Sequence, residues 1–310
     1  MREVLIGEAI RQRRLEMGLT QEKLCEGICD PVSISRIETG KQAPSRKKLK
    51  ALLNRLGMSG DLYYAIMSKN ETEITLLREK IICCYDNGEF LQGLAYLNQL
   101  RQIAEPEDKT VWQFILLLQS MMGQVKDGEL CPYSFQEKKQ LLKKAIGLTL
   151  PYFDIAKVSS GLYGIGEMAV LTQYAQALSD HGESGRALKL YEELFSCLKR
   201  RFDNILNSDG MLPLLACCYA KELDKNGDFK RAQEMIDLGW ESCVRYESYD
   251  YLPAILIVMA KICFHMGQPE ESLGCFYQMY YLYEAIGETR HMERVKQEAK
   301  DILGIELSVS

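Results

Sequence analysis

Three polar side chains, Ser33, Ser35 and Arg36, are left on one surface of a short predicted helix. The opposite surface of that helix carries Ile34 and Ile37, which are three residues apart and therefore face inward together. Hydroxyl and guanidinium groups donate hydrogen bonds, and a guanidinium can donate two in parallel to one planar acceptor group. The spacing predicts a set of hydrogen-bond donors on the exposed side of a short helix.

Capping residues mark the helices that must position these donors. Thr20 can cap a preceding short helix, in which Leu24 and Ile28 are four residues apart and form one apolar face. Asp30 followed by Pro31 is an N-cap followed by proline at the first helical position, so the second helix begins there. A short helix, a tight turn and a second short helix form a helix-turn-helix, the second helix of which enters the major groove of DNA.

The chain after this second helix supports the same arrangement. Gly40 suits a left-handed helix end, and Pro44 prevents continuation of the helix. Ser45 can cap a further helix, and an opening helix over roughly residues 4–17 completes a compact bundle. The apolar positions of the further helix are Leu49, Leu52, Leu53 and Leu56.

Charge is distributed unevenly along the chain. Residues 1–60 contain 12 basic and 7 acidic residues, a net charge of +5, whereas the whole chain has −5, so residues 61–310 carry −10. A basic segment on an acidic body is typical of a module that faces a polyanion. Basic residues on an ordinary solvated surface are the alternative, but together with the helix-turn-helix pattern the charge favours DNA binding.

The residues from Ile10 to Ser45 resemble the Xre/Cro-type repressor domain. Within that family the segment is most similar to the peptide-sensing regulators of Gram-positive bacteria, the PlcR/Rgg/PrgX group, and the resemblance covers about the first 58 residues. The matching elements are Arg14, Met17-Gly18-Leu19-Thr20-Gln21, Gly27-Ile28-Cys29, Ile34-Ser35-Arg36-Ile37-Glu38, Gly40-Lys41 and Pro44-Ser45.

The resemblance implies individual roles. Gln21 would hold a phosphate at a helix N-terminus, Val32 would pack on a thymine methyl group, and Arg36 would pair with guanine. Arg14 and Glu38 pair internally in that family and would stabilise the domain. Because Pro31 and Val32 replace long polar base readers, Arg36 and DNA shape would carry more of the specificity. The predicted DNA-contacting residues are Gln21, Val32, Ser33, Ser35, Arg36, Lys41 and Lys47.

Length and composition indicate two globular, all-α domains. The 310 residues are 47% apolar and 26% charged, and we expect a helix-turn-helix domain at 1–66 and a helical repeat domain at 70–310. No apolar run reaches about 18 residues and the N-terminus lacks a secretory signal pattern, so a cytoplasmic protein is predicted.

The cysteines and histidines do not have metal-ligand spacing. The chain has 11 cysteines without a CxxC pair, and 3 histidines, so we expect no metal and no cofactor. Most cysteines lie on apolar helical faces and would serve as small buried hydrophobes. A redox pair of Cys25 and Cys29 remains an alternative.

Four segments in the rest of the chain align on a glycine and indicate stacked helix pairs. These glycines are Gly88, Gly182, Gly227 and Gly267, and the last three are 45 and 40 residues apart. The positions around them resemble the tetratricopeptide repeat. Seven residues before the glycine that repeat needs a small residue, which Ala175, Ala220 and Ala260 supply and Ile81 does not. Five residues after the glycine it needs another small residue, supplied by Gly93, Ala187, Ala232 and Ser272. Nine residues after the glycine it needs a bulky apolar residue, supplied by Leu97, Tyr191, Ile236 and Phe276.

The remaining segments complete this predicted solenoid. A further helix pair is expected at Val111–Met122 and Gln136–Ile146, joined by a long connection from Gly123 to Ser134. The Gly/Ser-rich stretch Pro151–Gly166 would be a break, and Arg290–Leu303 would be a polar capping helix.

Stacked helix pairs curve, so their first helices line a concave groove that a short extended peptide could occupy. The register places in this groove Ile82, Thr172, Ser179, Cys217, Asp224 and Ile257, together with the predicted ligand-binding residues Arg78, Tyr85, Gln176, Lys221, Lys261 and Phe264. Solvation of an open surface is the alternative for each residue.

We therefore expect a transcription regulator that binds a double-stranded DNA operator as a homodimer and is controlled by a short peptide. A scaffold that holds a protein partner on its repeats, or a regulator that responds to such a partner, is the alternative. We find no phosphate loop, metal cluster or nucleophile motif that would favour an enzyme.

Overall fold

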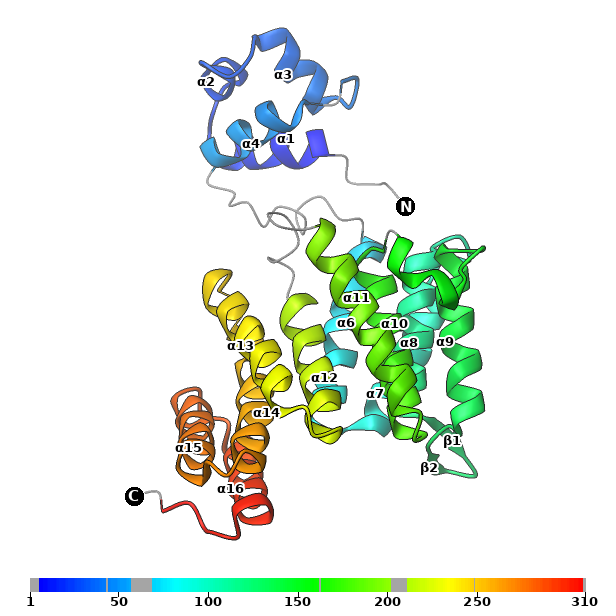
Figure 1. The fold of residues 1–310 in the computed structure, drawn as a ribbon. Helices are drawn as coiled ribbons and strands as arrows, with labels where there is room; N and C mark the ends of the chain where they lie inside the picture. Colours follow the sequence, from blue (N-terminus) through cyan, green and yellow to red (C-terminus); the bar gives the residue numbers. More distant parts are fainter. Residues whose placement is uncertain are drawn as a thin grey trace. The chain divides into compact units, whose positions relative to one another are not determined.

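The computed structural model describes residues 6–42, 44–56, 69–161, 163–201, 211–247 and 249–308 (Figure 1). The chain divides into two compact units, Met1–Glu105 and Pro106–Ser310. The described residues are almost entirely helical, which confirms the all-α prediction. Among them, no helix combines the length and hydropathy that a membrane crossing needs.

Four short helices in the first unit pack around one apolar core, which we call the head. Ile10, Leu24, Ile34 and Leu52 are fully buried at its centre. Gly7 permits the close approach of the first and third helices, because a Cβ atom there would overlap the carbonyl oxygen of Ile37. The helices are α1 (Ile6–Glu16), α2 (Gln21–Cys25), α3 (Pro31–Glu38) and α4 (Arg46–Arg55).

The predicted caps of these helices are present. Thr20 accepts a hydrogen bond from the Lys23 amide at 3.2 Å, and Asp30 accepts one from the Ser33 amide at 2.8 Å. Pro31 occupies the first turn of α3, and Gly40 follows the helix with a φ of 71°. The sequence therefore predicted where α2 and α3 begin from local backbone chemistry alone. The end of α2 differs from the prediction, because the helix stops at Cys25 and Ile28 follows it in a turn.

The first unit also contains the helix pair α6 (Lys69–Asp86) and α7 (Phe90–Ile103). Leu97 is buried in this pair, as the repeat register requires, and Ile81 is buried at the position where the other repeats have a small residue. Because the unit ends at Glu105, it does not test the predicted domain boundary between residues 66 and 70, which stays a prediction.

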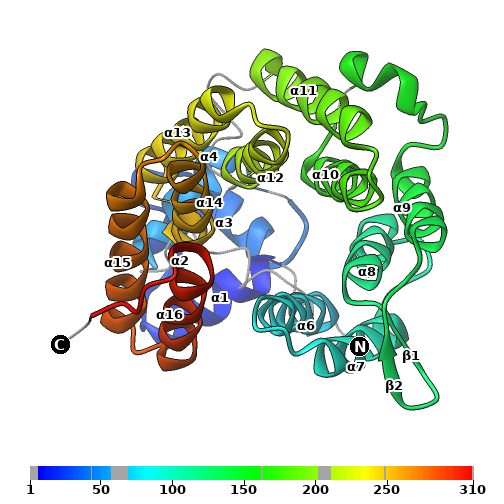
Figure 2. The same ribbon diagram turned by 60° about the horizontal axis from the view of Figure 1, so that its bottom comes forward.

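The second unit is a stack of helix pairs that curves in one direction (Figure 2). In that view the first helices of the pairs lie on the inner side of the curve and the second helices on the outer side. The first helices are α8 (Lys109–Met122), α10 (Ile165–Asp180), α12 (Met211–Lys225) and α14 (Leu252–His265); the second helices are α9 (Phe135–Thr149), α11 (Ser184–Arg201), α13 (Phe229–Arg245) and α15 (Pro269–Ala285). The helix α16 (Thr289–Leu303) follows, as predicted for a polar capping helix.

The small residues of the repeat register lie where paired helices touch. Ala175, Ala187, Ala220, Ala232, Ala260 and Ser272 are all fully buried. The Ser272 hydroxyl, on α15, donates to the Ala260 carbonyl on α14 at 2.7 Å, so this contact is direct. The bulky residues that close the pairs, Tyr191, Ile236 and Phe276, are also fully buried, which confirms the predicted register.

Two connections within the second unit have their own structure. The link from α8 to α9 contains an antiparallel hairpin of β1 (Gln124–Lys126) and β2 (Glu129–Cys131). Asp127 and Gly128 form its turn, both with positive φ, as a type I′ turn requires. The predicted break after Pro151 contains the 3₁₀ segment η1 (Ile155–Ser160), and η3 (Tyr249–Tyr251) precedes α14.

A buried ion pair joins α1 to α3 in the head. The Arg14 guanidinium donates to both carboxylate oxygens of Glu38, at 2.6 and 2.9 Å, and to the Leu19 carbonyl at 2.8 Å. Gln21 donates a further hydrogen bond to Glu38 at 2.8 Å. Both charged residues are buried, which confirms the internal pairing predicted for them.

Replacing Glu38 by alanine leaves the buried Arg14 guanidinium without its counterion. We expect Glu38→Ala to lower the local unfolding free energy of the head by about 3–5 kcal/mol. Hydrogen exchange of the α1–α4 amides in the full chain measures this loss.

The matched control removes both charges together. Arg14→Met combined with Glu38→Leu leaves no unpaired charge and should recover most of the lost protection. A double variant as unstable as Glu38→Ala would show that an uncompensated charge is not the cause.

Candidate functional site

The exposed side of α3 presents one cation beside an apolar side chain. Val32 is 60% exposed, and Arg36, one helical turn later, is also exposed. Within the described residues the Arg36 guanidinium has no hydrogen-bond or ion-pair partner, so all its donors are available to an external acceptor. Ser35 lies beside them and is half-buried.

Ser33 is engaged at the N-terminus of the same helix. Its amide and its hydroxyl both donate to the Asp30 carboxylate, at 2.8 and 2.6 Å. These bonds stabilise the ionised form and hold the pKa of Asp30 below its usual value. Ser33 thus fixes the start of α3, and a contact from its hydroxyl oxygen to DNA stays a prediction.

Gln21 has a structural bond that the sequence did not reveal. Its amide nitrogen donates to the buried Glu38 carboxylate, which places the side chain between α2 and α3. The predicted phosphate contact would therefore involve the backbone N–H groups of the first turn of α2 more than this amide.

The two predicted lysine contacts differ in what the structure describes. Lys41 is exposed just after α3, where its amide donates to the Arg36 carbonyl at 2.8 Å and closes the helix end. Lys47 lies in the first turn of α4, but its side chain falls outside the described part of the structure.

The cysteine pair in the head lies in an apolar environment. Cys25 is buried, and burial raises the pKa of both the Cys25 and the Cys29 thiols. A raised pKa lowers the thiolate fraction, so these thiols have the character of interior hydrophobes rather than of a reactive pair.

The inner helices of the second unit present a separate row of polar side chains. Gln176, Lys221 and Lys261 stand six residues before the turn glycines of successive repeats, so they occupy equivalent positions on α10, α12 and α14. Both lysines are exposed and have no ion-pair partner within the described residues. Gln176 is half-buried and donates to Asp180 at 2.9 Å.

Three residues that we predicted to face the groove are buried instead. Thr172, Ser179 and Cys217 are each no more than 5% exposed, so that prediction is wrong for them. Neighbouring inner helices pack against one another and bury both flanks of each helix, which leaves a narrower exposed face than the register suggested.

A histidine–carboxylate contact joins two repeats beside this row. His265, on α14, lies with Nδ1 at 2.8 Å from the Asp224 carboxylate on α12. Phe264, next to it, is 40% exposed on the predicted ligand-binding surface. The sequence did not reveal this contact, although both polar residues stand just before turn glycines.

Arg78 and Tyr85 belong to α6 in the first unit, where both are half-buried. Tyr85 stacks on Phe90 with ring centroids 5.8 Å apart, which fixes its ring against α7. Their predicted ligand contact stays a prediction.

Comparisons with known proteins give one family match, in the N-terminal part of the chain. Residues 10–63 match the sequence model of the helix-turn-helix family. A comparison with curated proteins gives no match.

Solved structures resemble almost the whole chain. PlcR of Bacillus thuringiensis, solved with the peptide PapR7 and DNA, has a TM-score of 0.70 at 16% identity, covering 94% of this chain and 98% of that one. ComR from S. thermophilus, solved with DNA and its signalling peptide ComS, has a TM-score of 0.62 at 17% identity, covering 97% of this chain and 100% of that one. The SHP pheromone receptor Rgg2 of Streptococcus dysgalactiae has a TM-score of 0.58 at 16% identity, covering 96% of this chain and 98% of that one.

These matches confirm the predicted resemblance at the level of the fold. The chain carries a helix-turn-helix domain at its N-terminus and, over nearly its whole length, has the fold of PlcR, ComR and Rgg2.

Proposed function

We propose that this chain is a sequence-specific DNA-binding transcription regulator whose activity is controlled by a short peptide bound on the inner helices of the repeats. The observation that carries the DNA-binding half is the exposed surface of α3, where Arg36 has no partner among the described residues. Such a regulator acts on chromosomal DNA and therefore in the cytoplasm.

The chemistry of α3 suits contact with base edges. A guanidinium donates two parallel hydrogen bonds to O6 and N7 of guanine, and the adjacent Val32 can pack on a thymine methyl group. The basic residues of the N-terminal segment supply phosphate contacts. One small head makes few contacts, so a homodimer on a pseudo-palindromic operator doubles them.

The inner surface of the second unit suits an extended peptide. Lys221 and Lys261 offer ammonium groups for a carboxylate, and the exposed Phe264 offers an apolar contact. PlcR and ComR were solved with peptides, which supports this ligand class for a chain of the same fold. Control of DNA binding would then be a coupling free energy between the two sites.

Arg36→Ala removes the guanidinium from α3 without touching the head's core. We expect DNA affinity to fall by about 1–3 kcal/mol and discrimination between operator variants to relax, because a bidentate base contact is lost. Fluorescence anisotropy on labelled upstream fragments, over a range of salt concentrations, measures both effects.

Arg13→Ala is the charge-matched control, since Arg13 is exposed on α1 and pairs with Glu16 at 3.0 Å. It should lower affinity less and leave sequence preference unchanged. Equal losses in the two variants would mean that Arg36 contributes only charge, and unchanged binding in both would count against α3 as the reading helix.

The peptide half is tested with a random library of synthetic heptapeptides, prepared with a free or an amidated C-terminus. We expect the combined Lys221→Met and Lys261→Met variant to retain about tenfold less of the free-carboxylate library, because charge-assisted hydrogen bonds are lost. Affinity selection with mass-spectrometric readout measures retention.

The control variant carries Lys189→Met and Lys230→Met, which removes two exposed lysines from the outer helices α11 and α13. It should retain the library as the parent does. Equal retention by both double variants would exclude Lys221 and Lys261 from the peptide site.

A further inference from the structure

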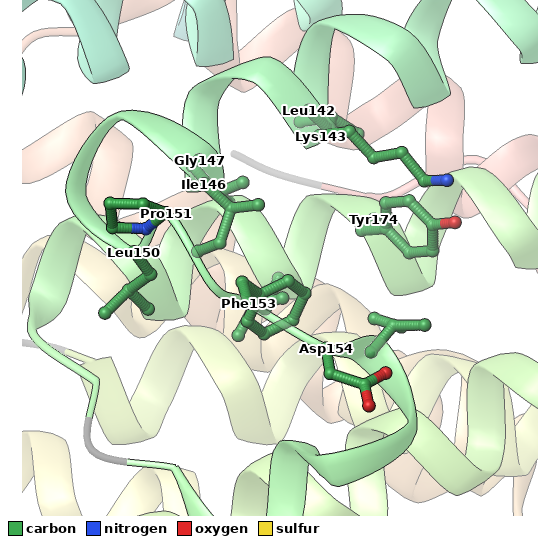
Figure 3. A pocket seen from close by; sticks show the side chains of 12 residues that line it. Leu142, Lys143, Ile146, Gly147, Leu150, Pro151, Phe153, Asp154 and Tyr174 are labelled. Carbon is green, nitrogen blue, oxygen red and sulfur yellow. The ribbon is translucent and has the colours of Figure 1, made fainter.

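A cavity in the second unit is lined by none of the residues of the Gln176–Lys221–Lys261 row. It has a volume of about 390 Å³, is partly open to solvent, and is lined by α9, by α10 and by the segment from Leu150 to Ile155 that leads into η1 (Figure 3). Pockets of this size bind small molecules rather than extended peptides. No part of the proposed function uses it.

The wall of this cavity is largely apolar. Leu142, Ile146, Val170 and Leu171 are buried side chains that line it from α9 and α10, and Phe153 closes it from the connecting segment. An apolar wall of this kind favours a ligand with a hydrocarbon body, because burial removes that body from water.

Gly147 is exposed and lines the open side of the cavity. It lies inside α9, where glycine weakens a helix relative to alanine, and a Cβ atom there would meet nothing within 4 Å. No backbone neighbour therefore requires a glycine at this position. Its missing side chain leaves room that a larger residue would fill.

The cavity has one polar end, where two hydrogen-bond donors lie on the same side as the Asp154 carboxylate. Figure 3 shows the Lys143 ammonium and the Tyr174 hydroxyl toward the same end, with Leu150 and Pro151 at the other. Neither group has a hydrogen-bond or ion-pair partner within the described residues. Burial raises the pKa of Tyr174, so its hydroxyl stays protonated and can donate.

The net charge of α9 as a whole favours an anion. Helix α9 contains four lysines and one glutamate, a net charge of +3 in a chain of net −5. The carboxylate of Asp154, which also lines the cavity, has partners within the protein. It accepts a hydrogen bond from the Ala156 amide at 3.0 Å and lies 4.0 Å from the Lys157 ammonium.

We propose that this cavity binds an aliphatic carboxylate of medium chain length, with the hydrocarbon chain against the apolar wall and the carboxylate at Lys143 and Tyr174. The cavity joins the second helix of one repeat to the first helix of the next, so the ligand stabilises the stacking of the two repeats.

Isothermal titration of the full chain with decanoate tests the assignment, and decanol serves as the uncharged probe. We expect one decanoate per chain with a dissociation constant on the order of 100 µM. Gly147→Leu fills the cavity and should abolish binding without lowering the melting temperature, because leucine favours the helix. Lys143→Met keeps the apolar stem and should weaken decanoate about tenfold while leaving decanol unchanged.

Two control variants make the same kinds of substitution at other positions. Lys144→Met removes the neighbouring positive charge, and Gly274→Leu replaces another helical glycine that has open space around it. Both variants should bind decanoate as the parent does. Three results would overturn the proposal: no saturable binding to the parent, unchanged binding to Gly147→Leu, or equal weakening by Lys143→Met and Lys144→Met. Peptide retention by Gly147→Leu reports on the proposed function separately.

Discussion

Very small side chains let helices of this chain approach one another closely, and the exposed surfaces of the described helices depend on that packing. In the head, Gly7 lets α1 lie against the Ile37 carbonyl of α3. In the second unit, Ala220 with Ala232 and Ala260 with Ser272 occupy the corresponding positions at fully buried contacts. Because these contacts fix how each helix is rotated about its axis, they also decide which side chains remain exposed.

The orientation of α3 about its own axis separates its inward-facing polar residues from its outward-facing ones. Glu38 turns inward, where Arg14 and Gln21 satisfy its carboxylate, and Arg36 turns outward without a partner among the described residues. A buried ion pair contributes little net stability but is costly to break, so its main effect is to hold α3 in one orientation. The buried ion pair therefore acts together with the buried Ile34 and Ile37 to hold the surface that carries Val32 and Arg36 in one direction.

Regular features of this fold could be predicted from the sequence because local chemistry determines them. The cap at Asp30 and the turn glycines predicted helix ends, and the small residues predicted the repeat register. Features that depend on tertiary neighbours could not be predicted: the register could not show that adjacent inner helices would bury Thr172 and Cys217, or that Glu38 would engage Gln21. The hairpin at Asp127-Gly128 had a recognisable turn signal, which we interpreted only as a long connection.

Helix α10 brings the two proposed ligand sites of the second unit together. Gln176 lies in register with Lys221 and Lys261 on the inner face, whereas Tyr174, two residues earlier, lines the cavity beside α9. A rigid helix cannot adjust to one ligand without moving the groups that meet the other. Any preference of either ligand for a particular stacking of α9 on α10 must then change the affinity of the other by the same factor, since coupling between binding sites is reciprocal. A peptide on the inner face and a carboxylate in the cavity are therefore thermodynamically linked to the extent that they favour different positions of α10.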